Sequence, residues 1–319
     1  MSLKKSFNDS QFIDNKTLII SKLNLPKEVS DSINGPSCLR TPNFIKNPLG
    51  KYLLYFAHHT GEFIRIAYSE DIFTGWRFLN CRINGISEEK NFHDHVASPD
   101  IYVDNNGKSI YMFFHSRIKG SREQKTFLSK SNDGINFVLV EGQMNLPFYF
   151  RHVIAENKTL AVTKGGNLYI NTISPISDTW RALNNVNTGE SNKEVMHNKF
   201  GSIRHASLIY YMKTFITFYT KIGDSPERIY AAKIVENQNG LWLTSNEFEI
   251  TRPELNFEGA NFDVEASLPG PSLHEENALR DPYIMQDGEN YFLFYACAGE
   301  KGIAVGKIFM TQIYQQLCA

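Results

Sequence analysis

The sequence has no long apolar run and almost no net charge, and each absence excludes a class of function. No stretch approaches the roughly 20 apolar residues that a membrane-spanning helix needs. A formal net charge of −1 argues against a partner recognised through global charge, so neither nucleic acid nor a membrane surface is expected. After Lys4 and Lys5 the segment 7–15 is polar and offers no signal core, so a cytoplasmic location is the expectation.

Cysteine is scarce, and several motifs are missing. The four cysteines (Cys38, Cys81, Cys297 and Cys318) form no Cys-x-x-Cys pair, so we expect free thiols in a reducing compartment. A glycine-rich phosphate loop and the Gly-x-Ser-x-Gly elbow of a serine nucleophile are also lacking. No cofactor and no metal ion are therefore predicted.

The composition that remains is that of a globular protein rich in strands. The chain has 319 residues, of which 42% are apolar and 21% charged, enough to build a sizeable core. Aromatic residues reach 13%, with 23 Phe and 15 Tyr, and flat rings pack well on pleated surfaces. Length alone allows one large all-β domain or two average ones.

A degenerate repeat organises the chain into five units. Each unit opens near a polar pair, followed by an apolar stretch, a turn and two further strand-like segments. The second members of successive pairs are 57, 54, 53 and 76 residues apart. The pairs are Arg40-Thr41, Ala97-Ser98, Arg151-His152, Arg204-His205 and Arg280-Asp281.

An aromatic residue recurs shortly after the third strand of four units. These residues are Trp76, Phe137, Trp180 and Trp242, so all three tryptophans occupy one place in the repeat. A fourth, outer strand that packs this ring between neighbouring units explains the pattern.

Five units of three or four antiparallel strands predict an all-β fold, a single five-bladed β-propeller domain spanning residues 1–319. The fifth unit ends near Phe309 without an outer strand, whereas segment 17–23 is a strand without a unit. We expect this N-terminal strand to complete the last blade and close the ring, which removes an open edge. A β-sandwich would not need a period of about 54 residues. The expected blades are approximately 38–80, 93–140, 148–183, 200–250 and 277–309.

The innermost strand of each blade lines the axis of a propeller, so the polar pairs should converge at one mouth of the channel. Clustered guanidinium groups repel one another unless an anion compensates them, which favours an acidic ligand. Inter-blade ion pairs are the structural alternative. The expected ligand-binding residues are Arg40, Arg151, Arg204, Arg280, Asp94, His95, Ser98 and Asp100, and Asp281, His205 and His152 should converge with them.

Three other segments could approach this mouth. His93-Asp94-His95 has the spacing of two metal ligands on one strand face, but no third ligand follows with suitable spacing, so a polar loop is preferred. The turn from Gly223 to Arg228 is either stabilised by Asp224 or contributes Glu227 or Arg228 to the pocket. The long fourth spacing indicates an insertion before the last blade that walls the pocket and carries a carboxylate into it.

Two segments carry a family resemblance. Ser98-Pro99-Asp100-Ile101-Tyr102-Val103, with the Asn106-Gly107 turn after it, resembles the second blade of family-43 glycoside hydrolases, the five-bladed arabinanases and xylosidases. A similar pattern of a polar pair, a proline and a strand occurs in Arg280-Asp281-Pro282-Tyr283-Ile284. A closer resemblance is to a group of uncharacterised bacterial glycosidase-like propellers. It is carried by the combination of Arg40-Thr41-Pro42, the turn from Gly223 to Arg228, Leu279-Arg280-Asp281-Pro282 and Ala298-Gly299-Glu300.

The resemblance implies a glycoside hydrolase that binds a saccharide in the axial pocket. The family uses an acid and a base across the glycosidic bond and a third carboxylate that tunes the acid. At the matching positions this sequence has Thr41, His152 and His205, and only Asp281 keeps the Asp-Pro form. The hypothesis is therefore Asp281 as base and His205 or His152 as acid, a role that suits histidine near neutral pH. An acidic or substituted sugar is expected from the arginines, and two alternatives stay open: a carbohydrate-binding propeller without turnover, or one that binds another small anionic metabolite.

Overall fold

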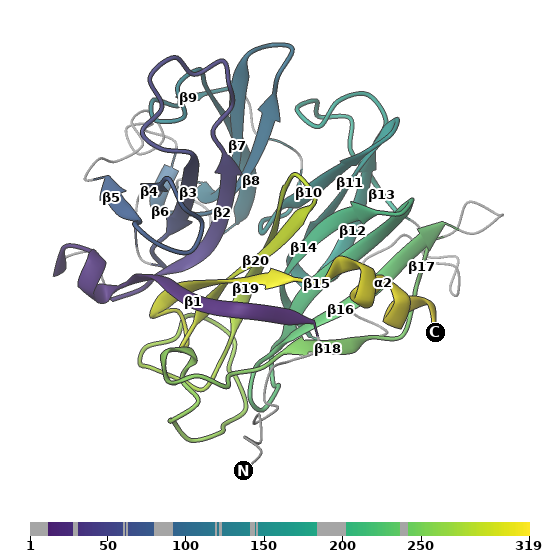
Figure 1. Ribbon diagram of the computed structural model, residues 1–319. Helices are drawn as coiled ribbons and strands as arrows, with labels where there is room; N and C mark the ends of the chain where they lie inside the picture. The colour runs from purple at the N-terminus through teal and green to yellow at the C-terminus, as the bar shows by residue number, and fades with distance from the viewer. Residues whose placement is uncertain are drawn as a thin grey trace.

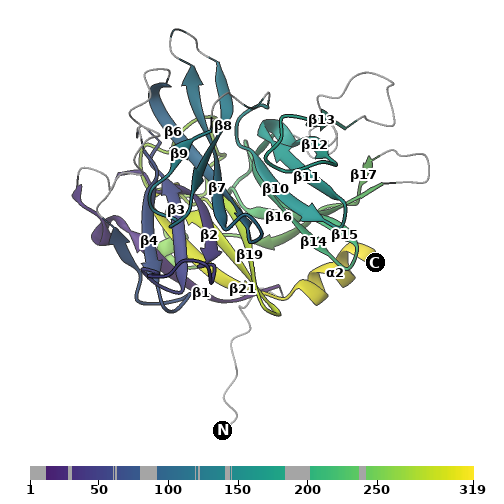
Figure 2. The same ribbon diagram turned by 90° about the horizontal axis from the view of Figure 1, so that it is seen from above.

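Five small antiparallel sheets surround a common axis in a computed structural model of the chain (Figures 1 and 2). The architecture is therefore the five-bladed β-propeller that the repeat predicts. The structure describes residues 12–27, 31–59, 61, 63–79, 92–118, 120, 123–140, 144, 146–183, 202–236 and 242–319, with only the backbone of residues 92–94 and 243.

The strands of each blade follow one another from the axis outward. Blade 1 consists of β2 (Asn34–Arg40), β3 (Tyr52–Ala57), β4 (Arg65–Ser69) and β5 (Arg77–Leu79). Blade 2 consists of β6 (Phe92–Asp104), β7 (Ser109–Ile118), β8 (Gln124–Ser131) and β9 (Val138–Leu139). Blade 3 consists of β10 (Arg151–Ala155), β11 (Lys158–Thr163), β12 (Asn167–Asn171) and β13 (Arg181–Ala182). Blade 4 consists of β14 (Ile203–Tyr211), β15 (Thr214–Lys221), β16 (Ile229–Glu236) and β17 (Trp242–Thr244), with β18 (Phe248–Thr251) also paired to β16.

Blade 5 joins the two ends of the described chain. It consists of β19 (Arg280–Asp287), β20 (Asn290–Cys297), β21 (Gly302–Ile308) and, outermost, β1 (Ile13–Ser21). β1 runs antiparallel to β21, with Thr17 opposite Val305. A Cβ on Gly306 would lie 2.5 Å from Cδ1 of Ile13, so glycine allows this close approach. Closure by the N-terminal strand is confirmed, although the expected strand 17–23 begins earlier and ends at Ser21.

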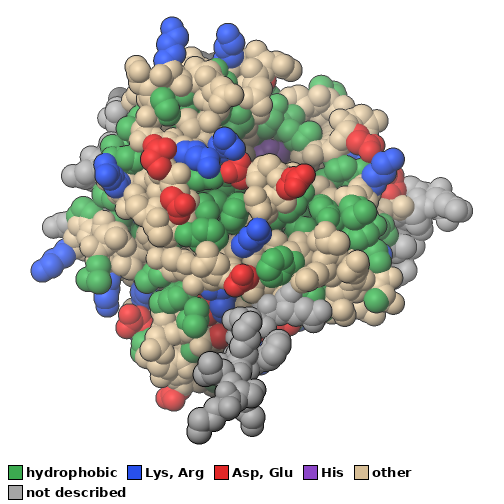
Figure 3. All heavy atoms as spheres, in the orientation of Figure 1, with side chains coloured by type: hydrophobic (Ala, Val, Ile, Leu, Met, Phe, Trp, Pro, Cys, Tyr) green, Lys and Arg blue, Asp and Glu red, His purple; other side chains and the backbone are tan. Residues whose placement is uncertain are grey.

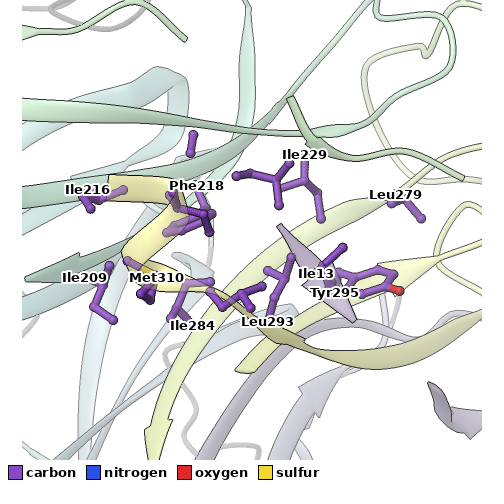
Figure 4. Close-up of a cluster of buried hydrophobic side chains, with 14 of the residues drawn as sticks. Ile13, Ile209, Ile216, Phe218, Ile229, Leu279, Ile284, Leu293, Tyr295 and Met310 are labelled. Carbon is purple, nitrogen blue, oxygen red and sulfur yellow. The ribbon is translucent and has the colours of Figure 1, made fainter. Parts of the chain in front are cut away.

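Apolar side chains fill the spaces between neighbouring blades in five separate clusters. Between blades 4 and 5, Phe218 of β15 packs with Leu293 and Tyr295 of β20 (Figure 4). The C-terminal helix α2 (Met310–Cys318) covers the same cluster with its buried Met310. Each blade therefore depends on both neighbours for burial, which is the physical reason for a closed ring.

The recurring aromatic residues lie at the outer edge of the blades, as expected. Trp76, Phe137 and Trp180 directly or closely precede the outer strands β5, β9 and β13, and Trp242 begins β17. Each ring belongs to a different inter-blade cluster. Their position in the repeat thus reflects packing between blades.

A β-bulge recurs in the innermost strands, and its position shows which residues of blade 1 are equivalent to those of the other blades. Each bulge inserts one extra residue into the inner strand. In β2, β6, β14 and β19, successive paired residues are three positions apart, whereas their partners on the next strand are two positions apart. Gly35, Ser98 and Asp281 lie at the same place in their bulges, with φ of 60°, 51° and 52°. The first-blade counterpart of Asp281-Pro282 is therefore Gly35-Pro36 and not Thr41-Pro42, and blade 1 begins at Asn34 rather than 38.

The cysteines and the surface agree with the composition of the chain. Cys38, Cys297 and Cys318 are free thiols, and Cys81 lies outside the described residues. In the part of the chain that the structure describes, no helix has the length and apolar character to cross a membrane. Positive and negative side chains are interspersed over the face shown in Figure 3, in keeping with the small net charge.

Candidate functional site

The polar residues of the axis gather at the end where the bulges lie, which we call the bulge end. At its centre, Nδ1 of His205 forms an ion pair with Oδ1 of Asp281. The backbone N–H of Gly35, in the bulge of blade 1, donates to Oδ2 of Asp281 at 3.0 Å. Bulges in three different blades thus bring these groups together, because a bulge turns the backbone toward the axis.

Asp281 is an ionised carboxylate whose oxygens are both engaged. It is 4% exposed, and burial by itself raises its pKa, but the charge and hydrogen bond of His205, the Gly35 N–H and the charge of Arg151 together hold the pKa below its ordinary value. Since Nδ1 of His205 is committed to Asp281, Nε2 is the nitrogen that can exchange a proton with a ligand. The two groups form a dyad of an orienting carboxylate and a histidine.

A row of rings borders the dyad. Tyr149 meets His205 edge to face with centroids 4.3 Å apart, and His115 lies 5.0 Å from Tyr149. Nε2 of His115 and Nε2 of His95 are 3.0 Å apart in a hydrogen bond. Burial raises the pKa of Tyr149, while burial and the neighbouring His95 lower that of His115, so both are neutral next to the charged dyad.

These rings enclose a small cavity directly against the dyad. Its volume is about 10 Å³, room for about one water molecule. Besides the rings and the dyad it is lined by Asn34, His59, Ala97 and Ser98. The structure therefore places His95 and Ser98 near the dyad, whereas the side chain of Asp94 lies outside the described residues.

A buried network of arginines and glutamates lies beside the dyad. Glu227, fully buried, accepts from Nε of Arg204 at 2.7 Å and from Nε of Arg280 at 2.9 Å. Arg280 also donates to Glu300 at 3.1 Å and to Glu276 at 2.8 Å. Two guanidinium groups thus share three carboxylates within the protein.

This network changes the expectation about the arginines. Arg151 points its guanidinium at two backbone carbonyls, those of Pro99 and, at 3.2 Å, Pro36. Arg40 lies at the opposite end of β2, largely exposed, and pairs with Asp287 at 2.6 Å. The four arginines therefore do not converge on one ligand. Ion pairs within the protein satisfy Arg204 and Arg280, so the electrostatic reason for an acidic ligand is absent. Glu227 pairs with Arg204 of its own blade and with Arg280 of blade 5, so only the second of these is the inter-blade ion pair of the structural alternative.

His152 belongs to a different part of the axis from His205. Its Nδ1 is 2.6 Å from Oδ2 of Asp100, which also accepts from the His152 backbone N–H at 3.0 Å. Both residues line a cavity of about 200 Å³ farther along the inner strands, together with Ser207 and Tyr283. The structure thus separates the two histidines that the sequence offered as alternative acids.

The predicted insertion surrounds a cavity beside the arginine–glutamate network. The segment between β18 and β19, the yellow-green loops in the lower part of Figure 1, encloses about 530 Å³. Arg280 and Glu276 lie in its wall, so this cavity adjoins the arginine–glutamate network. The expectation that the insertion walls the site and supplies a carboxylate agrees with this arrangement.

Several residues of the bulge end escaped the sequence reasoning. Tyr149 occupies the third blade at a positive φ of 59°, two residues before the Arg151-His152 pair that the repeat singled out. Glu300 and Glu227 lie in turns, and the sequence does not indicate that their side chains pair with the arginines. His115 lies within β7 and contacts His95 of its own blade and Tyr149 beside the next blade, so only the fold reveals these neighbours. The dipeptide Gly35-Pro36, which matches Ser98-Pro99 and Asp281-Pro282, is the sequence signal that would have found the bulge of blade 1.

Comparisons with known proteins agree with this fold. No family model matches the chain. An uncharacterised protein of Acanthamoeba polyphaga mimivirus is 29% identical over 316 residues, covering 87% of this chain and 83% of that protein. The bacterial source suggested by the resemblance is therefore not supported, since this relative is viral.

Solved structures with the same fold are glycoside-active enzymes. A thermostable family-43 glycoside hydrolase has a TM-score of 0.57 and 14% identity, covering 87% of this chain and 88% of that one. A glycosyl hydrolase from Bacteroides ovatus has a TM-score of 0.60 and 12% identity, covering 87% and 84%. A β-1,2-mannobiose phosphorylase from Listeria innocua has a TM-score of 0.57 and 13% identity, covering 80% and 69%. The chain is similar in fold to family-43 and other glycosidase propellers.

Proposed function

We propose that this protein cleaves a glycosidic bond at the bulge end of its axis, with His205 transferring the proton and Asp281 orienting it. The observation that carries the proposal is the buried His205–Asp281 ion pair beside a cavity at that end. Its fold is shared with glycoside hydrolases and a phosphorylase, which supports a glycoside as the substrate.

The assignment of Asp281 differs from the role that the family resemblance implies. Both of its oxygens are occupied, by His205 and by the Gly35 N–H, so it is placed to orient a neighbour rather than to activate water. In the proposed reaction, Nε2–H of His205 protonates the glycosidic oxygen as the bond to the anomeric carbon breaks. A water molecule adds to that carbon and gives its proton to Glu276. The oxygens of Glu276 also accept hydrogen bonds, from Arg280 and Ser272, but its side chain is 27% exposed and therefore open to water, whereas that of Asp281 is 5% exposed.

The substrate of this proposal is a saccharide that needs no acidic group. Asp281, Glu227, Glu276 and Glu300 place four carboxylates around the site, and the positive charges that face them are those of Arg151, Arg204, Arg280 and His205. Because these charges compensate one another, no positive excess remains to favour an acidic sugar.

A carbohydrate-binding role without turnover is the second candidate. It is favoured by the carboxylates themselves, because Glu227 and Glu300 are each held by arginine and are 0% and 1% exposed. A binding site needs no free acid and base, whereas hydrolysis does.

A pair of matched variants tests the proposal. Nitrophenyl glycosides and unsubstituted disaccharides of the common sugars are incubated with the wild type, His205→Gln and His152→Gln, with and without inorganic phosphate. We expect cleavage by the wild type and by His152→Gln, and loss of about 100-fold or more in His205→Gln, the range for a general acid. Binding of a saccharide without cleavage by any folded variant would favour the second candidate, and equal activity of both variants would contradict the role of His205.

A further inference from the structure

The insertion cavity is distinct from the small cavity beside the dyad, and hydrogen bonds hold the loop that surrounds it. The segment between Thr251 and Arg280 contains no strand, yet Arg204 donates to the carbonyls of Leu268 at 2.5 Å and Gly270 at 3.1 Å. The Ser267 N–H also bonds the carbonyl of Asp224 at 2.9 Å. The cavity of about 530 Å³ that this loop surrounds falls within the range of small-molecule sites, about 300–1,000 Å³.

Acceptor groups dominate the charged part of the wall. Asp263, Glu265, Glu275 and Glu276 all line the cavity. Glu275 lies 3.5 Å from Nζ of Lys22 and Glu276 is held by Arg280, but Asp263 and Glu265 are exposed and have no ion pair among the described residues. The lining cation Arg280 already has three carboxylate partners, so the wall keeps a net negative charge.

Asn277 gives an independent indication of the ligand's chemistry. Its side chain lines the cavity and is 8% exposed, and its Nδ2 donates to the carbonyl of Phe262 at 3.1 Å. Its Oδ1 has no hydrogen-bond partner among the described residues. A buried acceptor without a partner is costly, so a small shift of the Asn277 side chain that brought Oδ1 to a donor on a ligand would be favourable.

Part of the wall is apolar. Leu268 and Leu273 are 74% and 86% exposed, and Pro269 and Pro271 lie between them. Such side chains suit the C–H face of a sugar ring more than a bare metal ion. Among the described residues no group of three His, Cys, Asp or Glu could hold a metal.

From these observations we propose that the insertion cavity binds the sugar unit of an amine-bearing glycoside, with the ammonium group held by Asp263 and Glu265. This inference rests on the proposed function, since it names the substrate class of the adjoining site. The amine supplies the charge and the donors that the wall lacks, and the leucines and prolines contact the ring.

The test compares matched sugars on the full-length protein. The probes are the methyl glycosides of 2-amino-2-deoxy-glucose, -galactose and -mannose, each as the free amine and as the N-acetyl form, measured by calorimetry at about pH 6, where the amine is protonated. We expect at least one amine to bind about fivefold or more tightly than its N-acetyl form. This ratio should fall in about 0.5 M salt, because exposed charge pairs are screened.

Charge-matched variants identify the cavity as the origin of the preference. Asp263→Asn/Glu265→Gln should lower the ratio about threefold or more. Glu70→Gln/Glu289→Gln removes the same two charges from exposed positions outside the cavity lining and should leave the ratio unchanged. Overturning results are N-acetyl forms that bind as well as the amines, no binding by any probe, or a ratio that survives in the first double variant.

Two further arms separate the sugar from the amine and from turnover. Spermidine should bind more weakly than the best amino sugar, and equal binding would refute the sugar part of the inference. The two proposals are distinguished by comparing two measurements, the ratio of amine to N-acetyl binding and the cleavage of the glycoside, in the wild type and in His205→Gln. A preference for amines without cleavage in the wild type would overturn only the proposed function, and cleavage without the preference would overturn only this inference.

Discussion

The substitution Glu227→Gln should measure how much the arginine–glutamate network contributes to the free energy of unfolding. Glu227 is fully buried and accepts one hydrogen bond from each of Arg204 and Arg280, which are 5% and 1% exposed. Glutamine keeps the shape but removes the negative charge, and its amide group offers donors where both neighbours already donate.

The size of the effect follows from the partners that remain. Removing one member of a buried ion pair costs about 3–5 kcal/mol. Arg280 keeps Glu300 and Glu276, and Arg204 keeps two backbone carbonyls, so neither guanidinium loses every partner. We therefore expect the lower end, a loss of about 3 kcal/mol in the free energy of unfolding.

Equilibrium unfolding in urea measures this loss as a lower midpoint at an unchanged slope. The control is Glu247→Gln, since Glu247 also accepts from two groups, Tyr219 and Lys221, but its side chain is 27% exposed. That control should cost no more than about 1 kcal/mol. Equal effects of the two substitutions, or a stabler Glu227→Gln protein, would refute the account of the network.

Three other predictions address closure, packing and acid stability. Deleting residues 1–21 should lower the unfolding midpoint of the whole domain in one transition, because it exposes β21 and unpacks blade 5; an unchanged midpoint would contradict the closure argument. Saturation with a sugar should leave the fluorescence of Trp76, Trp180 and Trp242 nearly unchanged, whereas a large quench would place one of them at the site. The pKa of Asp281 is lower when folded, so the unfolded chain binds more protons and stability is lost as pH falls below about 4. Asp281→Asn should flatten this part of the stability–pH curve, and a curve as steep as that of the wild type would show that other groups cause it.

The fold could be predicted because its signals repeat. The spacing of the units, the recurring aromatic residue and the unpaired strand near the N-terminus each follow from how blades pack, and the structure confirms them. Local boundaries were less accurate in blade 1, where the bulge position is Gly35. A glycine there has no side chain to reveal the repeat, and the Arg-Thr-Pro sequence six residues later imitates it.

The site could be predicted only in part, because its electrostatics depend on residues from different blades. His205 and Asp281 were found from their place in the repeat. The partners of the arginines could not be found in this way, because Glu227 and Glu300 lie in turns between the second and third strands of their blades and contact the arginines only in the folded ring. Counting arginines without these carboxylates left out the negative charges that compensate them.

The dependence of the rate on the leaving group tests the central claim most directly, that His205 protonates the departing oxygen. For one sugar, kcat/KM is measured for the dinitrophenyl glycoside, which needs no acid assistance, and for an alkyl glycoside, which does. The account predicts that His205→Gln lowers the rate of the alkyl glycoside about 100-fold or more and that of the dinitrophenyl glycoside less than about tenfold. An equal loss for both glycosides would contradict it, because His205 would then act on binding or on the fold rather than on the leaving group.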